Sequence, residues 1–315
     1  MVAFTLSDPS MRAKTPLHLD LAVLFPAAAA FALGLSACGG EQGDPPPASP
    51  AGPLVGGFMI EEVFYTGSPG ATADHYFSDQ FIEIVNDATG TLYADGLLIA
   101  DVHGPSGEIN PGQEPTPFQD DAEHVYVSSL WRVPGSGQEH PVAPGESIVI
   151  AQDGVNHQPD SALDLSDADF ETYNERDDDK DVDWPNVPNL ERLHFTGGFD
   201  WLLPVFGPAV VIFRAEDPAA LEQVDVPGAS ELGPRLKVPN ALVIDAFEAL
   251  LDAESGAYKR VPAALDRGFV HASGTYTGES ARRKVAAEGE RPALADTDDS
   301  GADFEILPAP APRQP

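Results

Sequence analysis

Short segments in which apolar and acidic or polar side chains alternate are the feature that most constrains the fold of this chain. Alternation is typical of β-strands that bury one face. It extends over residues 58–64, 80–85 and 92–100, and residues 122–133, 146–152 and 208–215 are further strand candidates. Turn signals such as Asp95-Gly96 recur about every 10 to 15 residues, a spacing that suits a β-sandwich. The sequence therefore predicts a mainly β fold.

Three other segments depart from this pattern. Residues 153–200, called the acidic segment below, alternate poorly and predict a long loop-rich insertion with a short helix at 166–173. Residues 238–251 predict a strand that runs into a short helix. Residues 305–315 are rich in proline and alanine and predict a disordered tail.

The N-terminus has the organisation of an export signal. Arg12 and Lys14 precede an apolar run at residues 21–35, which is too short to span a bilayer. The run ends in Leu-Ser-Ala-Cys38, which resembles the site cut by lipoprotein signal peptidase. We expect a signal peptide over residues 1–37, a lipid on Cys38 and a flexible tether over residues 38–57. An ordinary signal peptide and a buried core helix are the alternatives.

The composition limits what the rest of the chain does. Cys38 is the only cysteine, so a disulfide framework is excluded. The 42% of hydrophobic residues predict that residues 58–304 fold into a β-rich domain. A net charge of −34 argues against nucleic acid as a partner and is typical of proteins from concentrated salt, where repulsion is screened.

One acidic run suggests a cation site. Asp179, Asp181 and Asp183 alternate, as in the first half of an oxygen-ligand calcium loop. Trp184 and Leu190 stand where such a loop needs Gly and a bidentate Glu. A solvated acidic loop, with no cofactor, is the simpler interpretation, and Ca²⁺ bound in another geometry is the alternative. A second run, residues 296–300, is interpreted as a turn built by Asp and Ser side chains.

The sequence contains no recognisable catalytic motif. It lacks Gly-x-Ser-x-Gly, and no two of its eight histidines have the spacing of a zinc protease. The basic patch at residues 277–284 is interpreted as internally paired with the acidic segment, and binding of an acidic ligand or a glycan carboxylate is the alternative. These observations favour a protein that is not an enzyme.

The N-terminal half, about residues 58–152, resembles lamin-tail domains. The similarity rests on a strand that ends in acidic residues, on Phe81-Ile82-Glu83 followed by Asn86, and on the turn around Gly96. The resemblance implies an immunoglobulin-like β-sandwich, here with long loop-rich insertions and a few short helices.

Over residues 58–304 the chain also resembles a family of bacterial envelope lipoproteins classed as a domain of unknown function. The matching motifs are residues 144–151, 187–190, 276–284 and 296–304. This resemblance and Cys38 imply a lipid-anchored envelope protein, and Gly39 after the cysteine favours the outer membrane. We expect a non-enzymatic binding or structural module whose partner is an envelope protein or a glycan. The alternative is an accessory or catalytic unit that acts on polysaccharide or protein, with or without calcium.

Overall fold

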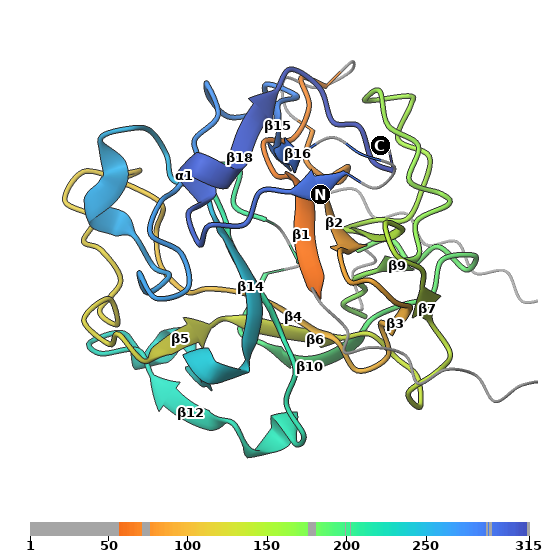
Figure 1. The fold of residues 1–315 in the computed structure, drawn as a ribbon. Coiled ribbons are helices and arrows are strands. Elements are labelled where there is room, and N and C mark those ends of the chain that lie inside the picture. Colours follow the sequence, from red (N-terminus) through yellow and green to blue (C-terminus); the bar gives the residue numbers. More distant parts are fainter. Residues whose placement is uncertain are drawn as a thin grey trace, which may run out of the picture. The chain divides into compact units, whose positions relative to one another are not determined.

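Two β-sheets packed face to face organise the computed structural model of the protein (Figure 1). The structure describes residues 57–70, 76–175, 181–198, 200–201, 203–287, 289 and 292–313. All of them belong to the unit Ala51–Pro315. The predicted signal peptide, Cys38 and nearly all of the predicted tether lie outside the described residues, so those predictions stay predictions.

The first sheet has six strands in the order β18-β15-β1-β2-β8-β9. They are β18 (Phe304–Leu307), β15 (Ser280–Arg283), β1 (Phe58–Phe64), β2 (Phe81–Asn86), β8 (Ser147–Ala151) and β9 (Phe170–Glu171). All neighbours pair antiparallel except β8 and β9, which are parallel. The two ends of the folded chain therefore lie in one sheet.

A bulge in β1 explains its side-chain pattern. The register with β2 shifts between Ile60 and Glu62, so Ile60 and Val63 both join the central core. Without the extra residue, strict alternation would turn Glu62 inward. The bulge instead leaves Glu62 on the opposite face, next to its strand partner Glu83.

The second sheet has five strands in the order β10-β6-β4-β11-β14. They are β10 (Glu191–Phe195), β6 (Ser129–Arg132), β4 (Leu98–Asp101), β11 (Ala209–Phe213) and β14 (Val243–Glu248). The interior strand β11, between β4 and β14, reads Ala-Val-Val-Ile-Phe and is buried throughout, because it packs on both faces.

Smaller elements surround these two sheets. A third sheet has the order β12-β13-β5, and the pairs β3-β7 and β16-β17 form short ribbons. Their bounds are β12 (Glu222–Asp225), β13 (Pro234–Pro239), β5 (His124–Val127), β3 (Leu92–Tyr93), β7 (Pro141–Val142), β16 (Val285–Ala287) and β17 (Ala293–Leu294). The described helices are short: η1 (Pro218–Ala220), η2 (Ser230–Leu232), η3 (Asn240–Leu242), η4 (Ser255–Tyr258) and α1 (Ser300–Asp303).

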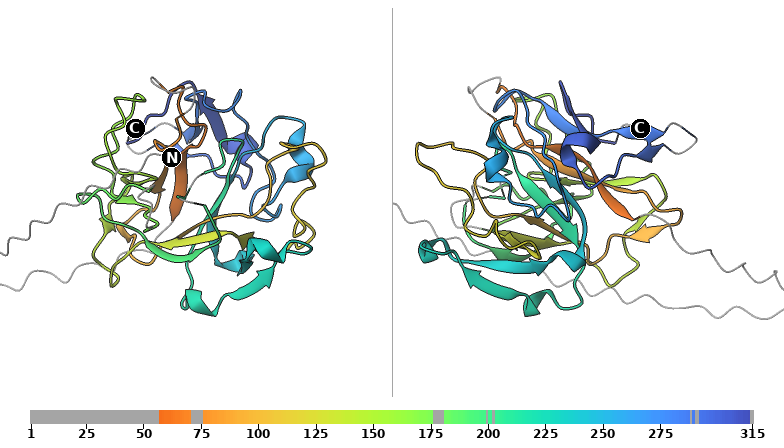
Figure 2. Two further views of the ribbon diagram at one scale, coloured as in Figure 1. Left: turned by 180° about the vertical axis from the view of Figure 1, so that it is seen from behind. Right: turned by 60° about the vertical axis from the view of Figure 1, so that its left-hand side comes forward.

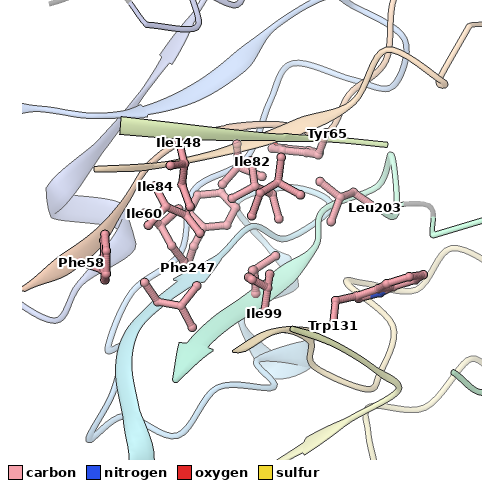
Figure 3. Packing of buried hydrophobic residues seen from close by; sticks show 14 of the residues in the cluster. Phe58, Ile60, Tyr65, Ile82, Ile84, Ile99, Trp131, Ile148, Leu203 and Phe247 are labelled. Atoms are coloured by element: carbon pink, nitrogen blue, oxygen red, sulfur yellow. The ribbon is translucent and has the colours of Figure 1, made fainter. Parts of the chain in front are cut away.

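The main core lies between the two large sheets (Figure 3). Ile60, Ile82 and Ile84 of the first sheet pack with Ile99 and Phe247 of the second. A second apolar cluster lies between the second and third sheets, which are neighbours in both views of Figure 2. The fold is thus layered, and each large sheet is apolar on both faces.

The acidic segment covers the outer face of the first sheet. Phe64, Phe81 and Val149 of this face pack against Leu165 and Val187 of the acidic segment. This cover brings the acidic segment close to the end of β8, and that contact positions the candidate site.

The predicted mainly β fold with few short helices is confirmed. Residues 58–64 form β1 as predicted, residues 80–85 match β2 to within one residue at each end, and residues 146–152 and 208–215 contain β8 and β11. Residues 92–100 divide at Gly96, whose φ of +72° makes the turn between β3 and β4. The closer likeness to a lamin-tail domain stays a prediction.

Three local expectations were wrong. Residues 166–173 contain the two-residue parallel strand β9 and no helix, because Phe170 and Glu171 pair with the edge of β8. Residues 238–251 begin with the end of β13 and the short helix η3, but their longer part forms the strand β14 and not a helix. Residues 305–307 belong to β18, and the backbone N–H groups of Ala311 and Arg313 donate to Glu62 and Glu83, so residues 305–313 are held in place.

Among the described residues, no helix is long and apolar enough to cross a membrane.

Candidate metal centre

Three buried aspartates from the two ends and the middle of the acidic segment meet at one end of the first sheet. Asp153 directly follows β8, Asp181 lies between β9 and β10, and Asp200 lies between β10 and β11. Each offers a carboxylate oxygen, and these oxygens lie within 4.8 Å of one another. The side chains are only 4%, 5% and 3% exposed. Water therefore screens their mutual repulsion poorly.

Hydrogen bonds from the protein fix one side of each carboxylate. The backbone N–H of Asn174 donates to Asp181 Oδ2 at 2.8 Å. Asp153 accepts from the backbone of Val182, and Asp200 accepts from the backbone of Trp201. The side-chain orientations are therefore set by the backbone.

Other oxygens in the centre are left without donors. Asp153 Oδ1 and Asp200 Oδ1 have no hydrogen-bond partner among the described residues. Gln152 donates its side-chain amide to Asp200, and its own Oε1 is buried without a partner. Buried polar atoms are normally satisfied, so such oxygens side by side point to a group that is bound there.

Burial makes the charged forms of the three carboxyl groups unfavourable, and their mutual repulsion adds to this effect. Burial, followed by the charges of Asp153 and Asp181, raises the pKa of Asp200 from 3.8 to about 8. Burial, followed by the charge of Asp181, raises the pKa of Asp153 to about 7. At neutral pH the centre therefore retains protons unless another positive charge replaces them.

The oxygen donors fit a hard divalent cation. Ca²⁺ binds carboxylate and amide oxygens at about 2.4 Å, so two ligands on opposite sides lie up to about 4.8 Å apart. The three aspartates meet this limit without movement. Gln152 presents its Nε2 to Asp200, so its Oε1 would become a further neutral ligand only with the side-chain amide turned over.

A second layer of hydrogen bonds positions Asp153. His157 Nε2 lies 2.9 Å from the backbone oxygen of Asp153, so this nitrogen carries the proton. Burial lowers the pKa of His157, and its neutral Nδ1 then accepts from the hydroxyl of Tyr76 at 2.7 Å. This chain of bonds anchors the backbone at Asp153 to the loop that carries Tyr76.

Glu171 of β9 connects the segments that carry Asp153 and Asp181. Its two oxygens accept from the backbone N–H groups of Gly154 at 2.6 Å and Trp184 at 2.7 Å. A Cβ at position 154 would lie 2.8 Å from Val187 and 2.9 Å from Glu171, so this close approach requires glycine. The centre is therefore held on both sides by β9.

The three residues predicted from the calcium-loop pattern do not lie together in one site. Asp179 lies outside the described residues. Asp181 is a member of the buried cluster, whereas Asp183 is exposed and accepts from the side-chain amide of Asn189 at 2.9 Å. Metal binding by these three residues stays a prediction.

Sequence reasoning missed Asp153 and Asp200. Their distances along the chain from Asp181 match no loop motif, because the pairing of β8 with β9 brings the segments together. The one local signal is Asp153-Gly154 directly after a buried strand.

The other charged motifs serve the fold. Arg283 of the basic patch pairs with Asp245 at 2.6 Å, and Arg282 pairs with Glu61 at 3.2 Å. The pairing is internal as predicted, but these partners lie outside the acidic segment. Asp299 caps α1 and Asp303 accepts from Thr297, so residues 296–303 form the predicted polar turn.

Comparisons with known proteins identify relatives. A family model described as "Protein of unknown function (DUF4876)" matches residues 143–311. A crystal structure of a DUF4876 family protein from Bacteroides thetaiotaomicron superimposes with a TM-score of 0.70 at 28% sequence identity. The match covers 80% of this chain and 71% of that chain. No curated protein matches the chain.

Proposed function

Because this chain belongs to DUF4876, a family described as proteins of unknown function, we propose a role from its own residues. It is a non-enzymatic binding or structural module of the bacterial cell envelope, stabilised by a bound Ca²⁺ ion. The buried cluster of Asp153, Asp181 and Asp200 is the observation that carries this proposal.

The burial of the cluster supports a structural role for the ion over a catalytic one. A hydrolytic carboxylate must contact its substrate, and side chains that are 3% to 5% exposed offer no surface to a polysaccharide or a protein. A structural ion needs the opposite arrangement, in which protein oxygens enclose it. The cation would hold the acidic segment against the end of β8.

Calcium is a better fit than magnesium. Mg²⁺ retains several waters and requires near-ideal octahedral geometry at about 2.1 Å, whereas Ca²⁺ accepts irregular sets of protein oxygens. Three buried carboxylates from irregularly spaced residues match the latter preference.

Calorimetric titration of the chelator-treated protein with CaCl₂ tests the ion site. We expect one site that D153N and D200N abolish and that D183N retains, since Asp183 is exposed and bonded elsewhere. Absence of heat at about 5 mM Ca²⁺, with no change in thermal midpoint, would refute the proposal. If D200N bound Ca²⁺ as tightly as the wild-type protein, the assignment of Asp200 as a Ca²⁺ ligand would be refuted.

The lipid on Cys38 is the proposed link to the membrane. The apolar run before the only cysteine supports this assignment. C38A should move the full chain from the membrane fraction to the soluble fraction while the thermal midpoint of the folded domain stays unchanged. If C38A stayed in the membrane fraction, the anchor would be wrong.

A further inference from the structure

The end of the chain lies across two buried carboxyl groups on the outer face of the first sheet. Glu62 of β1 and Glu83 of β2 are strand partners, and their side chains are 0% and 1% exposed. Partners in antiparallel strands have Cβ atoms about 5 Å apart, so the two carboxyl groups are neighbours. Neither belongs to the aspartate cluster of the metal centre, so this carboxyl pair requires a separate explanation.

Backbone N–H groups near the C-terminus bond one oxygen of each carboxyl group. The N–H of Ala311 donates to Glu62 Oε1 at 3.0 Å, and the N–H of Arg313 donates to Glu83 Oε1 at 2.9 Å. Residues 308–313, called the strap below, read Pro-Ala-Pro-Ala-Pro-Arg. Because proline has no N–H, the strap carries a donor at every second residue, and two of these donors reach the carboxyl pair.

The other oxygen of each carboxyl group is buried without a donor. Glu62 Oε2 and Glu83 Oε2 have no hydrogen-bond partner among the described residues. Two carboxylates cannot satisfy one another, because both only accept, whereas a carboxylic acid also donates. One proton held between the two groups would give both oxygens a partner.

The charged groups around the carboxyl pair are mostly negative. Arg282 of β15 pairs with Glu61 at 3.2 Å, and Arg313 of the strap pairs with Asp169 at 2.7 Å. In the part of the chain that the structure describes, the carboxylates that face the pair from neighbouring elements are Glu61 of β1, Glu146 before β8, Asp167 and Asp169 before β9, and Glu305 of β18. A second negative charge on the pair is therefore repelled by its surroundings.

The protonation of the pair depends on whether the strap covers it. Burial raises the pKa of Glu83 to about 7 and also raises the pKa of Glu62, and it exceeds the effect of the hydrogen bonds to both groups. When the strap leaves, water reaches the pair and both pKa values return toward the ordinary 4.5. The covered pair thus holds a proton that the uncovered pair releases, so a pH that rises through about 7 favours the uncovered form.

We propose that the strap is a pH-sensitive closure, which lies over Glu62 and Glu83 while they share one proton and is released when that proton passes to water. The arrangement that carries this proposal is the pair of facing strand partners, each with one oxygen bonded by the strap and one without a donor. The closure uses neither the calcium centre nor Cys38.

Hydrogen exchange of the C-terminal peptide measures release of the strap. It is followed by mass spectrometry in the full chain with about 5 mM CaCl₂ and corrected for the intrinsic effect of pH. We expect protection of residues 308–313 to fall about tenfold between pH 6 and pH 8.5, while the peptide that contains β11 stays protected. E83Q and E62Q each place a permanent amide donor in the pair, so both should keep the protection at pH 8.5. The exposed E222Q is the control and should respond as the wild-type protein does.

A311P tests the contact itself. It removes the N–H that bonds Glu62 without changing a charge, so it should lower the protection of the strap at pH 6 by at least about threefold. D200N separates this test from the calcium proposal, because the strap should keep its pH response in that variant while calcium binding is lost.

Three results would overturn the closure. The first is equal protection of the strap at pH 6 and pH 8.5 in the wild-type protein. The second is a loss of protection in E83Q and E62Q that matches the loss in the wild-type protein. The third is an A311P variant whose strap is as protected at pH 6 as that of the wild-type protein.

Discussion

D200N is the sharpest perturbation of the metal centre, because it removes one charge at nearly constant shape. In the cation-free protein, the Asp200 pKa is raised from 3.8 in the unfolded chain to about 8 in the folded one. A carboxyl group with a raised folded pKa binds more protons in the folded state between these values. The stability that it contributes is complete below about pH 4 and is lost as the pH rises through about 8.

The size of the effect follows from the shift. Each pKa unit corresponds to about 1.4 kcal/mol, so the carboxyl of Asp200 destabilises the cation-free fold by about 5 kcal/mol at pH 8 relative to pH 4. D200N removes this penalty. For a domain of this size we expect a thermal midpoint higher by about 10 to 20 °C in chelator at pH 8.

With calcium present, the wild-type protein should have a higher thermal midpoint than D200N, the reverse of the order in chelator. When free Ca²⁺ is at about a hundred times Kd, binding raises the free energy of unfolding of the wild-type protein by about 2.7 kcal/mol, and a higher Ca²⁺ concentration raises it further. D200N should gain nothing, because it has lost a ligand.

Differential scanning fluorimetry with EGTA and with CaCl₂, from pH 5 to pH 8, measures both effects. D183N is the control, since its exposed carboxylate lies outside the cluster. The reasoning would be refuted if D200N lowered the midpoint in EGTA at pH 8, or if calcium raised both midpoints equally.

Three further outcomes are expected. R260M should lower the free energy of unfolding in urea by about 3 to 5 kcal/mol, because it removes the guanidinium that pairs with the buried carboxylate of Glu248. The control R132M breaks the half-exposed pair with Glu191 and should lower it by at most about 1 kcal/mol. E83Q should destabilise the protein less at pH 8 than at pH 5, because burial raises the pKa of Glu83 to about 7 and so disfavours its ionised form in the folded state; an equal effect at both pH values would contradict this. The thermal midpoint in EGTA should rise between about 0.1 and 2 M NaCl, and a flat response would exclude adaptation to salt.

The sequence predicts where the strands lie along the chain better than it predicts which strands pair with one another. Alternation over residues 58–64 gives β1, and the continuous apolar run of β11 is recognisable as a strand. The strands β9 and β18 are missed, because Phe170–Glu171 and Phe304–Leu307 are too short for a periodic signal and form by pairing with existing edges.

The candidate centre was predictable only in part for the same reason. Asp181 belongs to a visible acidic run, but its partners Asp153 and Asp200 are ordinary aspartates in a chain with 51 acidic residues. What distinguishes them is burial, and burial is decided by how the acidic segment packs on β2 and β8. The spacing of the three aspartates along the chain does not indicate that packing.

Salt and calcium should therefore act on two separate sets of carboxylates. Exposed carboxylates repel one another through water, where the screening length falls to about 3 Å at 1 M salt, so NaCl relieves them. The oxygens of Asp153, Asp181 and Asp200 are 3% to 5% exposed and repel one another where mobile ions do not enter. Only a proton, an amide substitution or a cation bound among them relieves that repulsion, so calcium should still raise the stability of the protein in 2 M NaCl.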